Sequence, residues 1–256
     1  MRLLLILLFM LKSASALRYP SSSWIRDWNI IKKMRSQTLA PVDSMGAESL
    51  ADKTSADFGT PSFRFRTLIA TMLSPQTKDK QTSIALTNIQ TMLCPHPFLP
   101  SVLMNHTNEE VFKCISGVSF AKTKTENILK AAQTCVEVYQ DDIPPSIDEL
   151  LRLRGVGPKI AFLTFSIAYN QHLGIVVDTH VHRISNRLAW VDSNTPEQSR
   201  KQLEELIPNQ YWEEVNNVLV GFGQTICKAR APKCSTCLLN STCKYFNETQ
   251  NKEMSL

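Results

Sequence analysis

Four cysteines in the C-terminal part of the chain lie close enough in sequence to share one metal centre. They form the pattern Cys227-x6-Cys234-x2-Cys237-x5-Cys243. Thiols packed so densely are satisfied by a metal or by disulfides, and two disulfides would suit a secreted protein. A four-cysteine zinc site usually shows two short pairs, whereas only one pair is short here. A four-iron cluster tolerates longer spans between its ligands, so the spacing favours an iron–sulfur cluster, with zinc as the next alternative.

The loop between the first two of these cysteines carries three cations, Lys228, Arg230 and Lys233. A charged loop is usually no more than solvated surface. A short loop that a metal centre fixes at both ends would nevertheless hold its cations in place, which suits contacts to a phosphate backbone.

A glycine-rich turn, LRGVGPK at residues 153–159, separates two helical stretches. Gly155 and Gly157 permit a tight turn that exposes the backbone N–H groups around Val156, and Pro158 suits the first position of the next helix. Free N–H groups at a helix N-terminus bind phosphate without any side-chain charge. The motif alone fits a plain helix–turn–helix connection as well as a helix-hairpin-helix that grips a nucleic-acid backbone. Three basic side chains favour the second interpretation: Arg152, Arg154 and Lys159.

Lys159 and Asp178 are of types that can act as a nucleophile and as an acid or base, and each lies at the start of an expected helix. A neutral amine attacks an electrophilic carbon, and a carboxylate activates the amine or stabilises developing positive charge. From the residues alone, the simpler interpretations are a phosphate-binding lysine and a helix N-cap aspartate.

The elements that must position these groups are helical almost throughout. Apolar residues recur every three or four positions in residues 65–73, 85–93 and 128–139. Residues 159–169 are apolar nearly all round, as in a helix buried within a bundle. The only β-like run is 175–177, so the sequence predicts an all-α fold. The net charge of +5 suits a polyanionic partner but is too small to prove one.

The two ends of the chain differ from the rest. Residues 1–23 begin with an apolar run at 3–11, followed by small residues. This segment fits a secretory signal peptide, a mitochondrial transit peptide or a start site placed too far upstream. The apolar run is too short to cross a bilayer as a helix. Residues 244–256 are polar, and we expect them to form a flexible tail.

Taken together, these features resemble the endonuclease III family of the helix-hairpin-helix glycosylase superfamily. The matching stretches are the hairpin, VDTHVHRISNRLAW at residues 177–190, TMLSPQTKD at 71–79, and the cysteine spacing. The amino-acid sequence of 177–190 and of LVGFGQTIC at 219–227 most resembles that of the eukaryotic members. The resemblance covers approximately residues 24–243.

This resemblance implies a two-lobed fold. Residues 58–172 would form a six-helix domain with the helix-hairpin-helix. Residues 24–57 together with 173–243 would form a second lobe that bears the cysteine loop. DNA would bind across the cleft between the lobes, with the target nucleotide flipped out of the duplex.

The resemblance also implies roles for particular residues. Lys159 matches the family's catalytic lysine, Asp178 its catalytic aspartate, and Gln76 a residue that fills the gap left by the flipped base. The four cysteines match the ligands of a [4Fe-4S] cluster. The chain departs from the family in having Pro75 where Ala or Ser is usual, and Arg154 in place of Pro. The second intercalating loop is matched only loosely by residues 116–120, so no residue is assigned there.

The implied function is that of a bifunctional DNA N-glycosylase and AP lyase of base excision repair. Its substrate would be double-stranded DNA that carries an oxidised pyrimidine or an abasic site, bound by a monomer without membrane contact. A mismatch adenine glycosylase is less compatible, because that branch lacks the lysine at position 159. A non-catalytic DNA-binding module with zinc on the same cysteines is the alternative from another class. Because iron–sulfur assembly requires a reducing setting, we expect the nucleus and the mitochondrion rather than secretion.

Overall fold

The computed structural model describes residues 21–46 and 56–253. The expected leader at 1–23 falls almost wholly outside this part of the chain, as does the end of the expected tail, 254–256. The described residues form helices and loops without a β-strand, which confirms the all-α prediction. In chain order the helices are α2 (Ser21–Arg35), α3 (Pro41–Met45), α5 (Pro61–Leu73), α6 (Asp79–Leu93), α7 (Pro100–Met104), α8 (Asn108–Ile115), α9 (Ala121–Tyr139), α10 (Ile147–Leu150), α11 (Pro158–Ala168), α12 (Thr179–Arg187), α13 (Pro196–Leu206), the 3-10 turn η1 (Asn209–Tyr211), α14 (Trp212–Thr225), the 3-10 turn η2 (Cys234–Thr236) and α15 (Lys244–Glu253).

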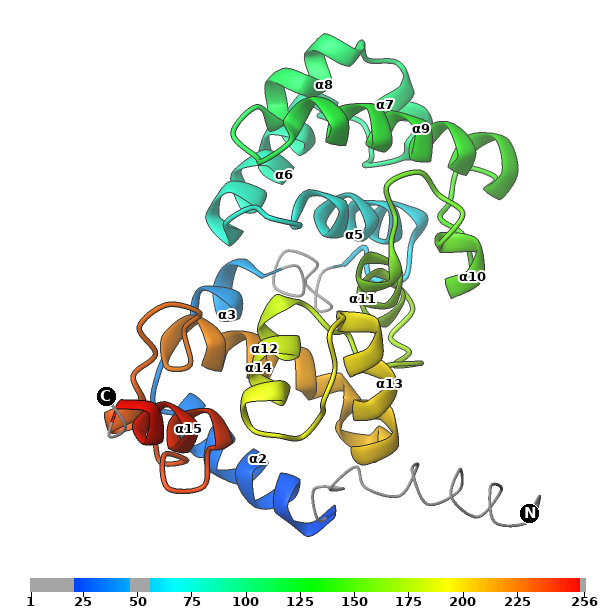
Figure 1. Ribbon diagram of the computed structural model, residues 1–256. Coiled ribbons are helices and arrows are strands. Elements are labelled where there is room, and N and C mark those ends of the chain that lie inside the picture. Colours follow the sequence, from blue (N-terminus) through cyan, green and yellow to red (C-terminus); the bar gives the residue numbers. More distant parts are fainter. Residues whose placement is uncertain (1–20, 47–55, 254–256) are drawn as a thin grey trace, which may run out of the picture.

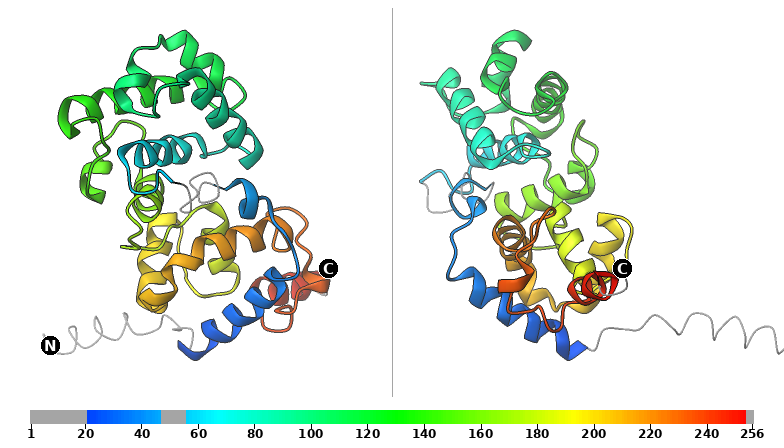
Figure 2. Two further views of the ribbon diagram at one scale, coloured as in Figure 1. Left: turned by 180° about the vertical axis from the view of Figure 1, so that it is seen from behind. Right: turned by 60° about the vertical axis from the view of Figure 1, so that its left-hand side comes forward.

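The helices form two lobes, seen one above the other in Figure 1 and from two further sides in Figure 2. One lobe packs α5 to α11 around an apolar core drawn from residues 65 to 168. The other packs α2 and α12 to α14 around a core drawn from residues 24 to 34 and 175 to 239. The region expected to hold six helices holds seven, of which α7 and α10 are short helices of five and four residues.

Contacts between the lobes are both apolar and polar. Phe63, Leu163 and Val176 belong to a small buried cluster that joins α5 and α11 to the segment before α12. The Gln224 side-chain amide on α14 donates to Asp79 Oδ2 at the start of α6 (2.9 Å). Its oxygen accepts from the backbone N–H of Val42 on α3 (3.0 Å). The bond to Asp79 ties the two lobes together next to the cleft, and the bond to Val42 holds α3 against α14 within the second lobe.

The helices that border the cleft are fixed locally by their ends and by a buried polar contact. Helix α5 starts with Pro61 at its first position and with Thr60 as N-cap, whose hydroxyl accepts from the backbone N–H of Phe63 (3.2 Å). Inside the lobe, the hydroxyls of Thr71 on α5 and Thr164 on α11 are 2.7 Å apart, so each satisfies the other in an otherwise apolar interface.

Within the expected flexible tail, residues 244–253 form helix α15. The guanidinium of Arg187 stacks on the ring of Tyr245, with its central carbon 4.1 Å from the ring centroid. The first turn of α15 continues directly from Cys243, whose carbonyl accepts from the backbone N–H of Asn247 (3.1 Å). These two contacts join α15 to α12 and to the cysteine segment. Among the described residues, no helix is long and apolar enough to span a membrane.

Candidate active site

A cavity of about 790 Å³ lies in the cleft between the lobes. The first lobe contributes the loop between α5 and α6 and the first turns of α11. The second lobe contributes residues 175–180, the start of α13 and one face of α14. Three residues assigned from sequence line this cavity: Gln76, Lys159 and Asp178.

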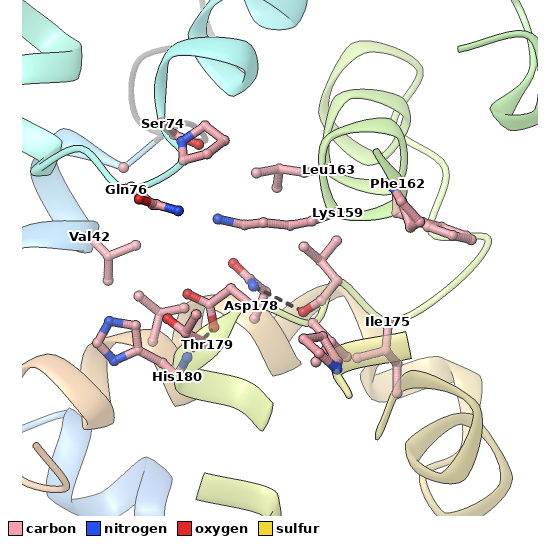
Figure 3. Close-up of a pocket in the computed structure, with 18 of the residues that line it drawn as sticks. Val42, Ser74, Gln76, Lys159, Phe162, Leu163, Ile175, Asp178, Thr179 and His180 are labelled. Carbon is pink, nitrogen blue, oxygen red and sulfur yellow. Dashed lines mark hydrogen bonds between the residues drawn. The ribbon is translucent and has the colours of Figure 1, made fainter. Parts of the chain in front are cut away.

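Lys159 is the second residue of α11, directly after Pro158. Its half-buried side chain extends into the cavity, where the amine lies between Gln76 and Asp178 (Figure 3). Among the described residues, none forms a hydrogen bond or ion pair with this amine. The lysine is therefore free to meet a ligand, and the carboxylate across the cavity is the nearest assigned group of opposite charge.

Asp178 is the N-cap of α12, as its position in the sequence predicted. Its Oδ1 accepts two backbone N–H bonds, from His180 and from Val181, both at 2.8 Å. Capping therefore occupies a single carboxylate oxygen. Because Asp178 also lines the cavity, the same side chain can order the helix through one oxygen and face a ligand with the other.

The glycine-rich turn joins α10 to α11 as a helix-hairpin-helix. Gly155 has φ +82, and an added Cβ would lie 2.6 Å from the Asn127 side-chain nitrogen, so glycine is required there. Gly157 is the N-cap of α11, with open space around its Cα, and no side chain caps this helix. Its first N–H groups are thus left for an outside anion. Val156 is buried at 7% exposure, so this assigned residue can offer only its backbone.

Gln76 lies on the loop between α5 and α6 and has a left-handed backbone, φ +56. Its exposed side chain projects into the cavity beside the Lys159 amine (Figure 3). The backbone N–H of Ser119 donates to the Thr77 hydroxyl (3.2 Å), which places the loop before α9 next to this one. The following residue, Phe120, is 65% exposed and also left-handed, φ +58. No residue in the loop before α9 was assigned from sequence. The exposed ring of Phe120 at the start of α9 is the feature by which the structure identifies a candidate DNA contact in this loop.

His180 is a second residue of the cavity to which the sequence analysis assigned no role. It lines the cavity, and its Nδ1 lies 3.1 Å from Arg183 Nη2. A guanidinium only donates, so Nδ1 accepts and the ring proton belongs on Nε2. Burial lowers the pKa of His180, partly opposed by Asp178, so the ring is a neutral donor at pH 7. His182 Nδ1 instead lies 2.6 Å from the buried Ser199 hydroxyl.

The four clustered cysteines surround one apolar pocket away from the cavity. Burial raises the pKa of Cys237 to about 11 and also raises the pKa values of Cys234 and Cys243, with the neighbouring thiols adding to each increase. Arg187 Nη1 donates to Cys227 Sγ (3.4 Å). Within the described chain, no three His, Cys, Asp or Glu side chains converge as a single metal ion requires. The site is thus four crowded sulfur donors around a shared apolar space.

The loop cations Lys228, Arg230 and Lys233 are all exposed on the surface beside this pocket. Arg187 holds the loop backbone, donating to the carbonyls of Lys228 (2.8 Å) and Ala229 (3.2 Å). The site residues predicted from sequence therefore fall into two groups, one in the cavity and the adjoining hairpin and one on the cysteine loop. Arg183 connects the groups, because the guanidinium that contacts His180 also donates to the carbonyl of Cys227 (2.9 Å).

Comparison with known proteins places this arrangement in a family. A family profile described as HhH-GPD superfamily base excision DNA repair protein matches residues 69–209. The endonuclease III homolog of Schizosaccharomyces pombe is 39% identical over 222 residues, which cover 87% of this chain and 61% of that protein. Endonuclease III-like protein 1 of Mus musculus is 39% identical over 223 residues, covering 86% of this chain and 72% of that protein. The chain thus spans about three fifths of the fission yeast relative.

Solved structures of endonuclease III share the fold. A non-covalent endonuclease III–DNA complex superposes with a TM-score of 0.74 and 24% identity, covering 91% of this chain and 99% of that one. A trapped covalent endonuclease III–DNA intermediate gives a TM-score of 0.67 and 26% identity, covering 86% and 98%. The two-lobed helical fold, the hairpin and the sequence matches agree: the chain belongs to the endonuclease III family within the HhH-GPD superfamily of base excision DNA repair proteins.

Proposed function

We propose that the protein is a bifunctional DNA N-glycosylase and AP lyase that removes oxidised pyrimidines from duplex DNA. The observation that carries this proposal is the Lys159 amine, which lies in the cleft near Asp178 without any hydrogen bond or ion pair among the described residues. A trapped covalent DNA intermediate of a 26% identical endonuclease III supports the same chemistry. Zinc-stabilised DNA binding without catalysis would not call for a free amine in a cavity of this size.

In the proposed reaction, Asp178 stabilises positive charge on the sugar while the bond from C1′ to the damaged base breaks. The Lys159 amine forms a bond to C1′, and the base leaves with the bonding electrons and takes up a proton. The sugar ring opens to a Schiff base, which acidifies the C2′ proton. Loss of that proton forms a C2′–C3′ double bond conjugated with the Schiff base, while the C3′–O bond breaks and the 3′ phosphate leaves with its electrons. Water then releases the enzyme.

DNA binding would use both groups of predicted residues. The uncapped start of α11 and the backbone of residues 155–157 would hold one phosphate group. The exposed cations Lys228, Arg230 and Lys233 would hold the backbone further along. Gln76 would occupy the gap left by the extruded base, and the exposed ring of Phe120 would insert beside it as an apolar wedge.

We further propose that Cys227, Cys234, Cys237 and Cys243 hold a [4Fe-4S] cluster. The donor set fits, because four thiols and no other metal-binding side chain surround the pocket, and crowded neighbouring thiols resist ionisation until a cation compensates them. Such a cluster would have all its ligand positions filled and would order the cation-bearing loop without taking part in bond cleavage.

The proposal extends to the setting in which the protein works. We propose a monomer that acts in the nucleus and the mitochondrion, since both hold duplex DNA in an intracellular, reducing setting that a cluster requires. Fusion of residues 1–26 to a fluorescent protein tests the location, and entry into the secretory pathway would contradict it.

The activity is tested by incision of an end-labelled duplex that contains thymine glycol. The wild-type protein should cut 3′ to the lesion and leave a β-elimination product. Lys159→Gln should bind the same duplex and cut at less than a hundredth of the wild-type rate. Lys78→Gln is the matched control, since Lys78 is an exposed lysine that lines the same cavity. Full incision by Lys159→Gln would refute the proposed nucleophile.

A further inference from the structure

One lysine of the first lobe is buried without an ion pair among the described residues. Lys124, in the first turn of α9, is 9% exposed. Its ammonium uses its three donors on Leu73 O (2.6 Å), Pro75 O (2.8 Å) and Thr77 Oγ1 (2.9 Å). All three acceptors belong to the end of α5 and the loop that follows it, so a single cation on α9 binds this loop.

The acceptors bracket Gln76, since Pro75 and Thr77 are its two neighbours. Gln76 has φ +56, a left-handed conformation that costs a non-glycine residue energy and persists only where its surroundings impose it. The backbone N–H of Thr77 closes the turn on Ser74 O (3.1 Å). The ammonium holds both flanks of that turn in place.

A lysine is a costly choice for this position if packing is the only requirement. Burial, and then the charge of Lys159, lowers the pKa of Lys124 to about 8, so the cation is kept at neutral pH against the preference of its surroundings. An apolar side chain would fill the same space without that cost. The ammonium adds three hydrogen bonds to one loop, and we call these three bonds the Lys124 clamp.

We propose that Lys124 is a positioning residue that presets the Gln76 backbone, so that the Gln76 side chain is ready to enter the gap when the damaged nucleotide leaves the duplex. The inference rests on the proposed function, because it requires base extrusion in this cleft. Without the clamp, the loop between α5 and α6 samples other conformations. The loop must then be ordered again each time a damaged nucleotide leaves the duplex, which slows base release. The chemistry at Lys159 does not require the clamp.

The experiment compares two substrates that differ in whether a gap must be filled. Single-turnover base release is measured on duplex DNA with thymine glycol, and borohydride trapping is measured on a single strand that carries a preformed abasic site. Lys124→Met and Gln76→Ala should each slow base release from the duplex by roughly tenfold to a hundredfold. Lys124→Met should trap the single strand within about twofold of wild type, since no partner strand leaves a gap there.

A double-mutant cycle separates positioning from general destabilisation. If Lys124 acts through Gln76, the Lys124→Met/Gln76→Ala variant is no slower on the duplex than Gln76→Ala alone. Lys130→Met is the matched control, because it removes the same charge from an exposed position of the same helix, and it should behave as wild type. The inference would be overturned if the rate losses of the two single variants multiplied in the double variant. It would also be overturned if Lys124→Met slowed trapping of the single strand as much as it slowed base release from the duplex. Failure of wild type to release the base would instead overturn the proposed function.

Should Lys124→Met fail to fold, the acceptor side of the clamp provides the same test. Thr77→Val removes the hydroxyl that accepts from Lys124 and from the N–H of Ser119. Thr77→Ser keeps that hydroxyl. The inference expects slow duplex release in Thr77→Val and recovery in Thr77→Ser, and equal rates in the two variants would contradict it.

Discussion

The two roles of Asp178 can be separated by substitution. Its Oδ1 caps α12 through the backbone N–H groups of His180 and Val181, and the side chain faces the Lys159 cavity. Asp178→Asn keeps an amide oxygen for the cap but removes the negative charge. Asp178→Ala removes both. The first variant should therefore be nearly as stable as wild type and inactive, and the second should be destabilised and inactive.

The expected magnitudes follow from the contacts. Replacing an N-cap side chain by alanine costs roughly 0.5–2 kcal/mol of unfolding free energy, and two N–H groups without a partner put Asp178→Ala at about the upper end. Asp178→Asn loses only the interaction of a charge with the helix dipole, roughly 0.3–1 kcal/mol. For a chain of this size, 1 kcal/mol moves Tm by about 2–4 °C, so the two variants should differ by about 3 °C or more.

Both quantities are measured on the same preparations. Thermal unfolding followed by circular dichroism gives Tm, and single-turnover release of thymine glycol gives the chemical rate, which should fall by at least about a hundredfold in both variants. Equal Tm values for Asp178→Ala and Asp178→Asn would refute the capping role. Base release by Asp178→Asn at the wild-type rate would refute the need for a charge.

Three further substitutions test the surroundings of the site. Gly155→Ala should cost about 1–2 kcal/mol of unfolding free energy because of φ +82, whereas Gly157→Ala, in open space, should be close to neutral in urea unfolding; equal losses would contradict the hairpin geometry. Arg187→Met removes the donor to Cys227 Sγ and the carbonyl contacts of the loop, so iron content should fall and affinity for undamaged DNA should drop roughly tenfold; unchanged values for both would contradict it. Burial lowers the pKa of Lys124 to about 8 in the folded state, whereas the pKa of a lysine in the unfolded chain is near 10.4. Between these two pH values the unfolded chain binds more protons, so this group adds to the free energy of unfolding as pH rises through the window. Urea unfolding of Lys124→Met at pH 7.5 and pH 10 should lack that increase, and a pH dependence equal to that of wild type would contradict it.

The parts of the site that could be predicted from sequence are those that depend on short stretches of the chain. Helical periodicity indicated the all-α fold, and the two glycines of the hairpin indicated its turn, because each reports a backbone requirement of its own segment. The N-cap position of Asp178 was readable for the same reason.

Residues that depend on long-range contacts were not readable. Lys124 looks like an ordinary helical cation in the sequence, and its role is evident only once α9 is packed against the loop after α5. His180 has no role that the sequence reveals, and only its contact with Arg183 in the fold fixes it as a donor that lines the cavity. Helix α15 depends on a stacking contact between Tyr245 and Arg187, 58 positions apart in the chain, which a polar composition does not reveal.

The central claim is that Lys159 forms a Schiff base with the sugar of a damaged nucleotide. The most direct measurement is borohydride trapping on duplex DNA with thymine glycol, followed by mass spectrometry of the cross-linked peptide. The account predicts a covalent adduct on Lys159 in the wild-type protein and none in Lys159→Gln. An adduct on another residue, or base release by wild type without any adduct, would contradict it.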